Sequence, residues 1–190
     1  IVGAAVALGA PQHARLSQLA QQPLDWAEIE RIALQHGLAA LVYQGLRSVE
    51  LAQPPAWLDR LRALAQQGAQ QSLLLAGELI RLLRALDAAG IAVLNLKGAV
   101  LAAAAYGNLA LRQFVDIDIL VQPRDLPRAR DVLATHGYQC DEQIDRARES
   151  DYLRLQHHYS YRRPGGVLVE LHFKLRERFF AFAIDHDAIW

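Results

Sequence analysis

The chain has 190 residues, of which 53% are hydrophobic and 21% are charged. This composition supports a sizeable core and excludes global disorder, so we expect one domain with at most a small appendage. The 20 basic and 20 acidic residues give a formal net charge of zero, which removes the electrostatic case for a long nucleic acid as the main partner.

Residues 1–89 are expected to form an N-terminal helical region. Asp25 has Glu28 three residues later, a spacing typical of a capping box at the start of a helix. Gly37 is positioned to end that helix. A second, shorter helix is expected over residues 38–49.

A long amphipathic helix is expected after the break at Pro54-Pro55. Its leucines recur near helical spacing over residues 56–89. Gly68 and Gly77 weaken this helix, since glycine lowers helix propensity. Gly90 is expected to end it.

Residues 90–190 change their pattern and predict a compact α/β core. A buried strand is expected over residues 91–96, followed by a turn at Lys97-Gly98 and a short helix over 99–106. The next strand is expected over residues 114–121, a run of β-branched and apolar residues.

The C-terminal part predicts one more helix and a β-hairpin. Asp125 is expected to cap a helix that ends at Gly137. Strands over 155–163 and 167–173 flank the turn Pro164-Gly165-Gly166, which is typical of a hairpin. The predicted fold class is therefore α+β, with a mixed sheet flanked by helices after an N-terminal helical region.

Cysteine content and hydropathy bound where the protein functions. The single cysteine, Cys140, excludes a disulfide within the chain and a cysteine-based zinc site. This usage fits the reducing cytoplasm, where we expect the protein to be. No apolar run reaches the length of a membrane span, because Lys97, Gly98 and Gly107 interrupt the longest candidates. We therefore expect no membrane partner.

Two carboxylates lie within the apolar strand expected over residues 114–121. Side chains two residues apart on a strand point to the same face, so Asp116 and Asp118 project together. Val115, Ile117 and Ile119 point to the other face. Neighbouring carboxylates repel each other and are costly to bury without a partner. A hard divalent cation such as Mg²⁺ would resolve this conflict.

The last predicted strand offers a third carboxylate. Leu168, Glu170 and His172 share one face of that strand. If the strand lies beside the first acidic strand, Glu170 joins Asp116 and Asp118, and the three can hold one or two metal ions for phosphoryl transfer. The alternative is that these acids are ordinary charges on a half-exposed sheet.

Two further elements are expected to bind phosphate. Lys97-Gly98 follows a strand and opens a helix, where glycine lets backbone N–H groups approach an anion. Arg112 precedes the acidic strand and can contact a phosphate bidentately. The alternatives are a plain turn with a solvated Lys97, and a salt bridge from Arg112 to Asp116 or another acid.

Histidines form a second polar cluster in the predicted hairpin. His157 and His158 lie at one end of its first strand, and one of them can meet His172 on the second strand. Histidines with a carboxylate can bind zinc or act as acid and base. The alternative is that these histidines only make satisfied hydrogen bonds.

An ordered series of motifs resembles the uncharacterised nucleotidyltransferase family of the DNA polymerase beta-like superfamily. The resemblance covers about residues 70–190. The motifs are Leu96-Lys97-Gly98-Ala99, Tyr106, Arg112, Asp116-Ile117-Asp118-Ile119-Leu120-Val121, His136-Gly137-Tyr138, His157-His158 and Val169-Glu170-Leu171-His172.

The resemblance implies transfer of a nucleoside monophosphate from a nucleoside triphosphate to an acceptor hydroxyl, with Mg²⁺ or Mn²⁺. The acceptor would be a small molecule, a peptide or a protein. The implied catalytic and metal-binding residues are Asp116, Asp118 and Glu170. The nucleotide would also contact Lys97, Gly98, Arg112 and His172.

The sequence departs from the family pattern at two motifs. The phosphate loop has Lys97-Gly98-Ala99 where Gly-Ser is usual, and Glu170 stands where Asp is usual. The family also implies a further helical region beyond Trp190. The departures favour one alternative, a nucleotidyltransferase fold that binds without catalysis. The histidine cluster gives another, a zinc hydrolase that uses His157, His172 and an acid.

Overall fold

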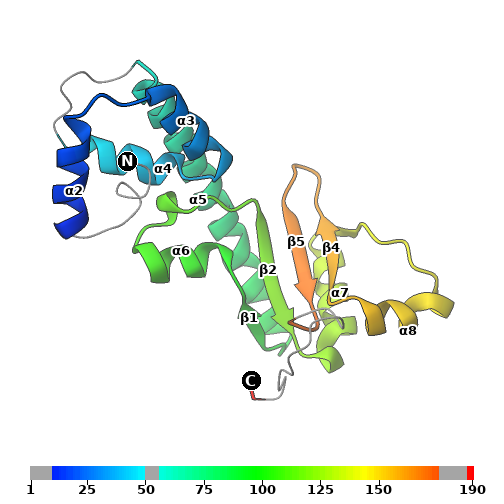
Figure 1. Cartoon of the computed structure of the whole chain (residues 1–190). Helices are drawn as coiled ribbons and strands as arrows, with labels where there is room; N and C mark the ends of the chain where they lie inside the picture. The colour runs from blue at the N-terminus through cyan, green and yellow to red at the C-terminus, as the bar shows by residue number, and fades with distance from the viewer. Residues whose placement is uncertain (1–9, 50–55, 176–187) are drawn as a thin grey trace. The chain divides into compact units, whose positions relative to one another are not determined.

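The computed structural model describes residues 10–49, 56–175 and 188–190. These residues form helices and one mixed five-stranded sheet, which confirms the predicted α+β class (Figure 1). The chain divides into two compact units. The first comprises Ile1–Leu74 and Leu101–Phe114, and the second comprises Leu75–Val100 and Val115–Trp190. None of the described helices has the length and apolarity needed to cross a membrane.

Helices build the first unit. They are α2 (Ala10–Ala20), α3 (Trp26–Gln35), α4 (Ala39–Arg47), the first half of α5 (Leu58–Ala88), most of α6 (Gly98–Tyr106) and the 3-10 turn η1 (Leu109–Leu111). The apolar faces of α2, α3, α4 and α5 meet in one core, which contains Leu16, Ile29, Ala33, Ala39, Val42, Leu46 and Leu61.

The predicted start and end of α3 are confirmed. The Asp25 side chain caps the helix by accepting a hydrogen bond from the Glu28 backbone N–H at 3.1 Å. Glu28 does not complete a capping box, because its carboxylate instead accepts hydrogen bonds from Arg31. Gly37 follows with a φ of 64°, a conformation that favours glycine.

The long helix α5 runs from Leu58 to Ala88 without interruption. Gly68 and Gly77 lie inside it, and Gly68 has a packing reason: a Cβ there would lie 3.2 Å from Nε2 of Gln113. Gly90, with a φ of 66°, follows the helix as predicted. The predicted break at Pro54-Pro55 lies outside the described residues.

The sheet belongs to the second unit and has the order β1-β2-β5-β4-β3. The strands are β1 (Val93–Asn95), β2 (Asp116–Val121), β3 (Gln139–Cys140), β4 (His158–Arg162) and β5 (Leu168–His172). Strands β2 and β5 are parallel, and every other pair is antiparallel. The other elements of this unit are the second half of α5, the first residues of α6, η2 (Pro123–Asp125), α7 (Leu126–Thr135) and α8 (Arg146–Leu155).

Three local expectations need correction. The strand predicted over 91–96 is shorter, because β1 is an edge strand that pairs only with β2 over Val93–Asn95. The predicted hairpin begins at His158 rather than at residue 155, which still belongs to α8. Asp125 makes no side-chain cap of α7; its carboxylate accepts a hydrogen bond from Arg128 at 3.1 Å.

One face of the sheet is covered by α7. The guanidinium of Arg130 lies 4.9 Å from the ring centroid of Tyr159, and Ala129 and Leu133 of α7 are fully buried. Because Tyr159 pairs with Leu171, this apolar face is the one opposite Asp118 and Glu170. Asp118 and Glu170 therefore lie on the face of the sheet that α7 does not cover.

The second half of α5 is tied to the segment that follows α7. Glu78 accepts hydrogen bonds from the Tyr138 hydroxyl and from Arg81, whose Nε lies 2.9 Å away. Arg163, at the turn end of β4, lies 3.5 Å from the same carboxylate. Glu78 is only 10% exposed, so these polar contacts are shielded from water.

Candidate active site

Asp118 and Glu170 lie side by side at the centre of the sheet. In the parallel pairing of β2 with β5, Asp118 is directly opposite Glu170, and Asp116 is opposite Leu168. The predicted adjacency of the two acidic strands is therefore confirmed. One oxygen of Asp118, one oxygen of Glu170 and one ring nitrogen of His172 lie within 4.8 Å of one another.

Asp118 is almost completely buried, with 1% exposure. Its Oδ1 accepts a hydrogen bond from Lys97 Nζ at 2.8 Å and lies 3.2 Å from Nε2 of His172. The other oxygen, Oδ2, is buried without a hydrogen-bond partner among the described residues. An unsatisfied buried carboxylate oxygen is costly, so this atom is the part of the site that most needs a ligand.

The electrostatics of the site keep Asp118 ionised. Burial alone would raise the pKa of this carboxyl, but the hydrogen bonds from His172 and Lys97 and the Lys97 charge together hold it well below its usual range. The hydrogen bond to Asp118 raises the pKa of Lys97, with further contributions from the charges of Glu170 and Asp116. The two side chains thus form a charged pair at neutral pH.

His172 links the two carboxylates. Its Nε2 lies 3.2 Å from Asp118 Oδ1 and 3.2 Å from Glu170 Oε2, and the side chain is 5% exposed. Since both neighbours are hydrogen-bond acceptors, the proton of a neutral ring belongs on Nε2. The N–H of His172 therefore points toward both carboxylates and holds them in position.

The other predicted site residues have different placements. Asp116 is half-buried at the start of β2 and stands outside the cluster formed by Asp118, Glu170 and His172. Gly98 opens α6 with a φ of 60°, a conformation that strains any residue with a side chain. Arg112 lies in the first unit, with a buried Nη1 that has no hydrogen-bond partner among the described residues. Phosphate contacts from Gly98 and Arg112 stay predictions.

Sequence reasoning missed Asn95. Its side-chain Nδ2 donates a hydrogen bond to the backbone carbonyl of Asp118 at 3.0 Å, and the Leu96 N–H donates to the same oxygen at 3.1 Å. These bonds fix the backbone that carries the buried acid. The available signal was a polar residue in an otherwise apolar strand, immediately before Leu96 and Lys97.

The donor set fits a hard divalent cation. Carboxylate oxygens are the ligands that Mg²⁺ and Mn²⁺ prefer, and Asp118 Oδ2 is a buried oxygen in need of such a partner. Lys97 supplies the positive charge that pairs with Asp118, and its side chain is 51% exposed. That exposure leaves the amine room to move toward a ligand.

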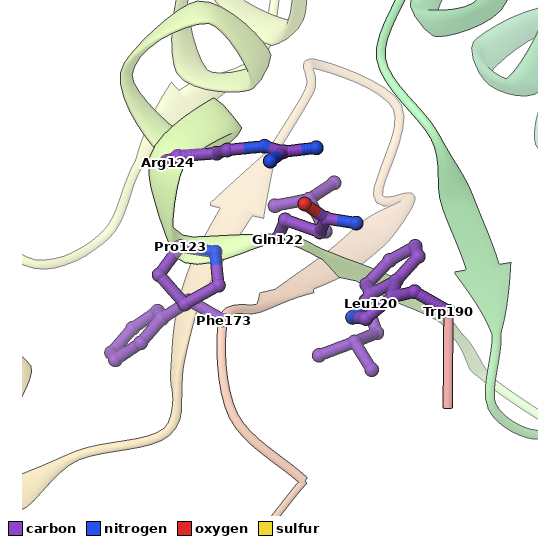
Figure 2. A pocket seen from close by; sticks show the side chains of 7 residues that line it. Leu120, Gln122, Pro123, Arg124, Phe173 and Trp190 are labelled. Atoms are coloured by element: carbon purple, nitrogen blue, oxygen red, sulfur yellow. The ribbon is translucent and has the colours of Figure 1, made fainter. Parts of the chain in front are cut away.

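A separate pocket of about 290 Å³ lies beyond the end of β2 (Figure 2). Its walls combine aromatic and apolar side chains with Gln122 and Arg124. The lining residues are Leu120, Val121, Gln122, Pro123, Arg124, Phe173 and Trp190. None of the predicted catalytic carboxylates lines this pocket, so it is distinct from the acidic cluster.

The protein is of the α+β class, with a mixed sheet that places Asp118 and Glu170 opposite each other on two parallel strands. A family model described as uncharacterised nucleotidyltransferase matches residues 22–190. The chain belongs to this family, which implies a nucleotide substrate. The match extends further toward the N-terminus than the sequence motifs indicated. Searches of curated proteins and of solved structures gave no match.

Proposed function

We propose that the protein transfers a nucleoside monophosphate from a nucleoside triphosphate to a hydroxyl of a small molecule, peptide or protein in the cytoplasm, with Mg²⁺ or Mn²⁺. The observation that supports this most is the opposed pair Asp118 and Glu170, where a buried oxygen of Asp118 lacks a hydrogen-bond partner among the described residues. Family membership supports the general class of reaction.

The proposed metal ligands are Asp118, Glu170 and, from the sequence pattern, Asp116. When bound, the cation would offset the triphosphate's negative charge and help the pyrophosphate leave. Asp118 is ready for this role because its carboxyl stays ionised. His172 keeps both carboxylates oriented through its Nε2.

In the proposed reaction, Lys97 pairs with the negative charge of a phosphate, and Glu170 accepts the proton of the acceptor hydroxyl. Lys97 leaves Asp118 as the triphosphate binds and pairs with a phosphate oxygen, a movement supported by its exposed side chain. Glu170 accepts the proton of the acceptor hydroxyl as that oxygen attacks phosphorus. The backbone of Gly98 contributes a further phosphate contact, and the phosphate contact of Arg112 stays a prediction from the sequence.

The Lys97 to Met variant tests the phosphate role of the amine. We expect triphosphate affinity in the presence of Mg²⁺ to fall about ten- to a hundredfold, because one charge-assisted hydrogen bond to phosphate is lost. Isothermal titration calorimetry with a non-hydrolysable triphosphate measures this. Arg62→Met, at an exposed position of α5, is the control and should bind normally. Unchanged affinity in Lys97→Met would remove Lys97 from the nucleotide site.

The Lys97–Asp118 ion pair also favours a second candidate, a protein that kept the fold without the chemistry. In that case the amine permanently replaces the cation, and Ala99 instead of serine fits a degraded phosphate loop. This candidate predicts that Mg²⁺ does not strengthen triphosphate binding to the unmodified chain. Clear Mg²⁺ dependence in the same calorimetry would eliminate it.

A further inference from the structure

Three histidines gather at one end of the β4–β5 hairpin. His158 opens β4 and is directly opposite His172, the last residue of β5. His157 precedes β4, and its carbonyl accepts hydrogen bonds from the N–H groups of Phe173 at 2.9 Å and Lys174 at 3.2 Å. The backbone thus places all three imidazoles at the same edge of the hairpin.

The three rings are close enough to share one ion. His158 Nδ1 lies 3.1 Å from His157 Nε2, and the His172 ring centroid is 5.4 Å from that of His157 and 5.1 Å from that of His158. One ring nitrogen from each residue lies within 4.8 Å of one from each other residue. Tetrahedral zinc with Zn–N bonds of 2.0–2.1 Å separates its nitrogen ligands by about 3.3 Å, so only small adjustments are needed.

The hydrogen bonding of His172 independently indicates that one of its ring nitrogens is available to bind a metal ion. Its Nε2 faces the carboxylates of Asp118 and Glu170 at 3.2 Å each, which makes Nε2 the protonated nitrogen. Nδ1 then carries the lone pair, and this atom is buried without a hydrogen-bond partner among the described residues. A metal-bound histidine typically donates its second ring N–H to a carboxylate, which is the arrangement that His172 has.

We propose that His157, His158 and Nδ1 of His172 bind a divalent transition-metal ion of the zinc class. Neutral imidazole suits such ions, whereas Mg²⁺ prefers oxygen ligands. This histidine site is therefore chemically distinct from the proposed Mg²⁺ site and does not depend on nucleotidyl transfer. Its ion would lock the His172 ring, and with it the orientation of Asp118 and Glu170, and would join the start of β4 to the end of β5.

Zinc titration in the presence of excess Mg²⁺ tests the site, because Mg²⁺ competes for carboxylate oxygens and not for imidazole nitrogens. We expect one Zn²⁺ per chain and a rise in thermal stability on binding. His157→Asn and His158→Asn should each weaken Zn²⁺ binding at least tenfold and reduce the thermal shift at the same Zn²⁺ concentration. His36→Asn, at an exposed position after α3, is the matched control and should bind like the unmodified chain. Circular dichroism without metal verifies that each variant folds.

Cobalt gives a second readout that reports the ligands directly. Co²⁺ bound by the imidazoles should give visible absorption bands that the His157 and His158 variants lack. Absence of zinc binding by the unmodified chain would overturn the proposal, as would binding by both histidine variants that is as tight as binding by the unmodified chain. Zinc binding that persists in those variants but disappears in Glu170→Gln would assign the ion to the carboxylates and would also overturn it.

Discussion

Nucleotidyl transfer should fall about a hundred- to a thousandfold when Asp118 is replaced by Asn, the usual cost of losing one group that stabilises transition-state charge. The amide keeps the shape of the carboxylate but removes the charge that pairs with Lys97 and that the cation requires. Pyrophosphate release from a nucleoside triphosphate, measured with a panel of hydroxyl-bearing acceptors and Mg²⁺, gives the rate.

The control for this variant is Asp151→Asn. Asp151 lies on the exposed surface of α8 and pairs only with Arg154 among the contacts described for its carboxylate. The same chemical change there should leave the rate unchanged. If Asp118→Asn folds normally and releases pyrophosphate as fast as Asp151→Asn, the carboxylate has no role in catalysis.

The largest effect on stability is expected at Glu78. Its hydrogen bond from Arg81, helped by Tyr138 and the nearby Arg163, lowers its pKa from 4.5 to about 2. A folded-state pKa below the unfolded value stabilises the protein at neutral pH. Glu78→Gln should therefore reduce the free energy of unfolding at pH 7 by about 2 to 3 kcal/mol. Urea unfolding followed by circular dichroism measures this.

The stabilisation by Glu78 should depend on pH. The contribution is complete above the unfolded pKa near 4.5 and is lost as the pH falls toward 2, so the variant and the unmodified chain should converge in acid. Glu28→Gln is a matched control, because Glu28 makes the same type of pair with Arg31 on an exposed helix face. Its unfolding free energy should hardly change. An equal loss in both variants would mean that burial adds nothing at Glu78.

Much of the acidic cluster could be predicted from local sequence. The alternation of side chains along a strand placed Asp116 and Asp118 on one face, and the turn at Pro164-Gly165-Gly166 defined the hairpin that carries Glu170. Both patterns depend on short-range geometry. The parallel pairing of β2 with β5 then brought Asp118 opposite Glu170.

Contacts that depend on register between distant strands could not be predicted. The ion pair of Lys97 with Asp118 follows from the antiparallel pairing of β1 with β2, and nothing in the sequence around Lys97 encodes that register. For the same reason, Asp116 was grouped with Asp118 although only Asp118 joins the cluster with Glu170.

Hydrophobic periodicity also cannot show which core a long helix contacts. The two compact units divide α5 between Leu74 and Leu75, and the predicted domain boundary at residues 89 and 90 stays a prediction.

A crystal structure with Mg²⁺ and a non-hydrolysable nucleoside triphosphate tests the central claim most directly. We predict a cation at about 2.1 Å from oxygens of both Asp118 and Glu170, with Lys97 moved from Asp118 to a phosphate. A triphosphate bound elsewhere, or Lys97 still paired with Asp118 in a saturated crystal, would contradict it.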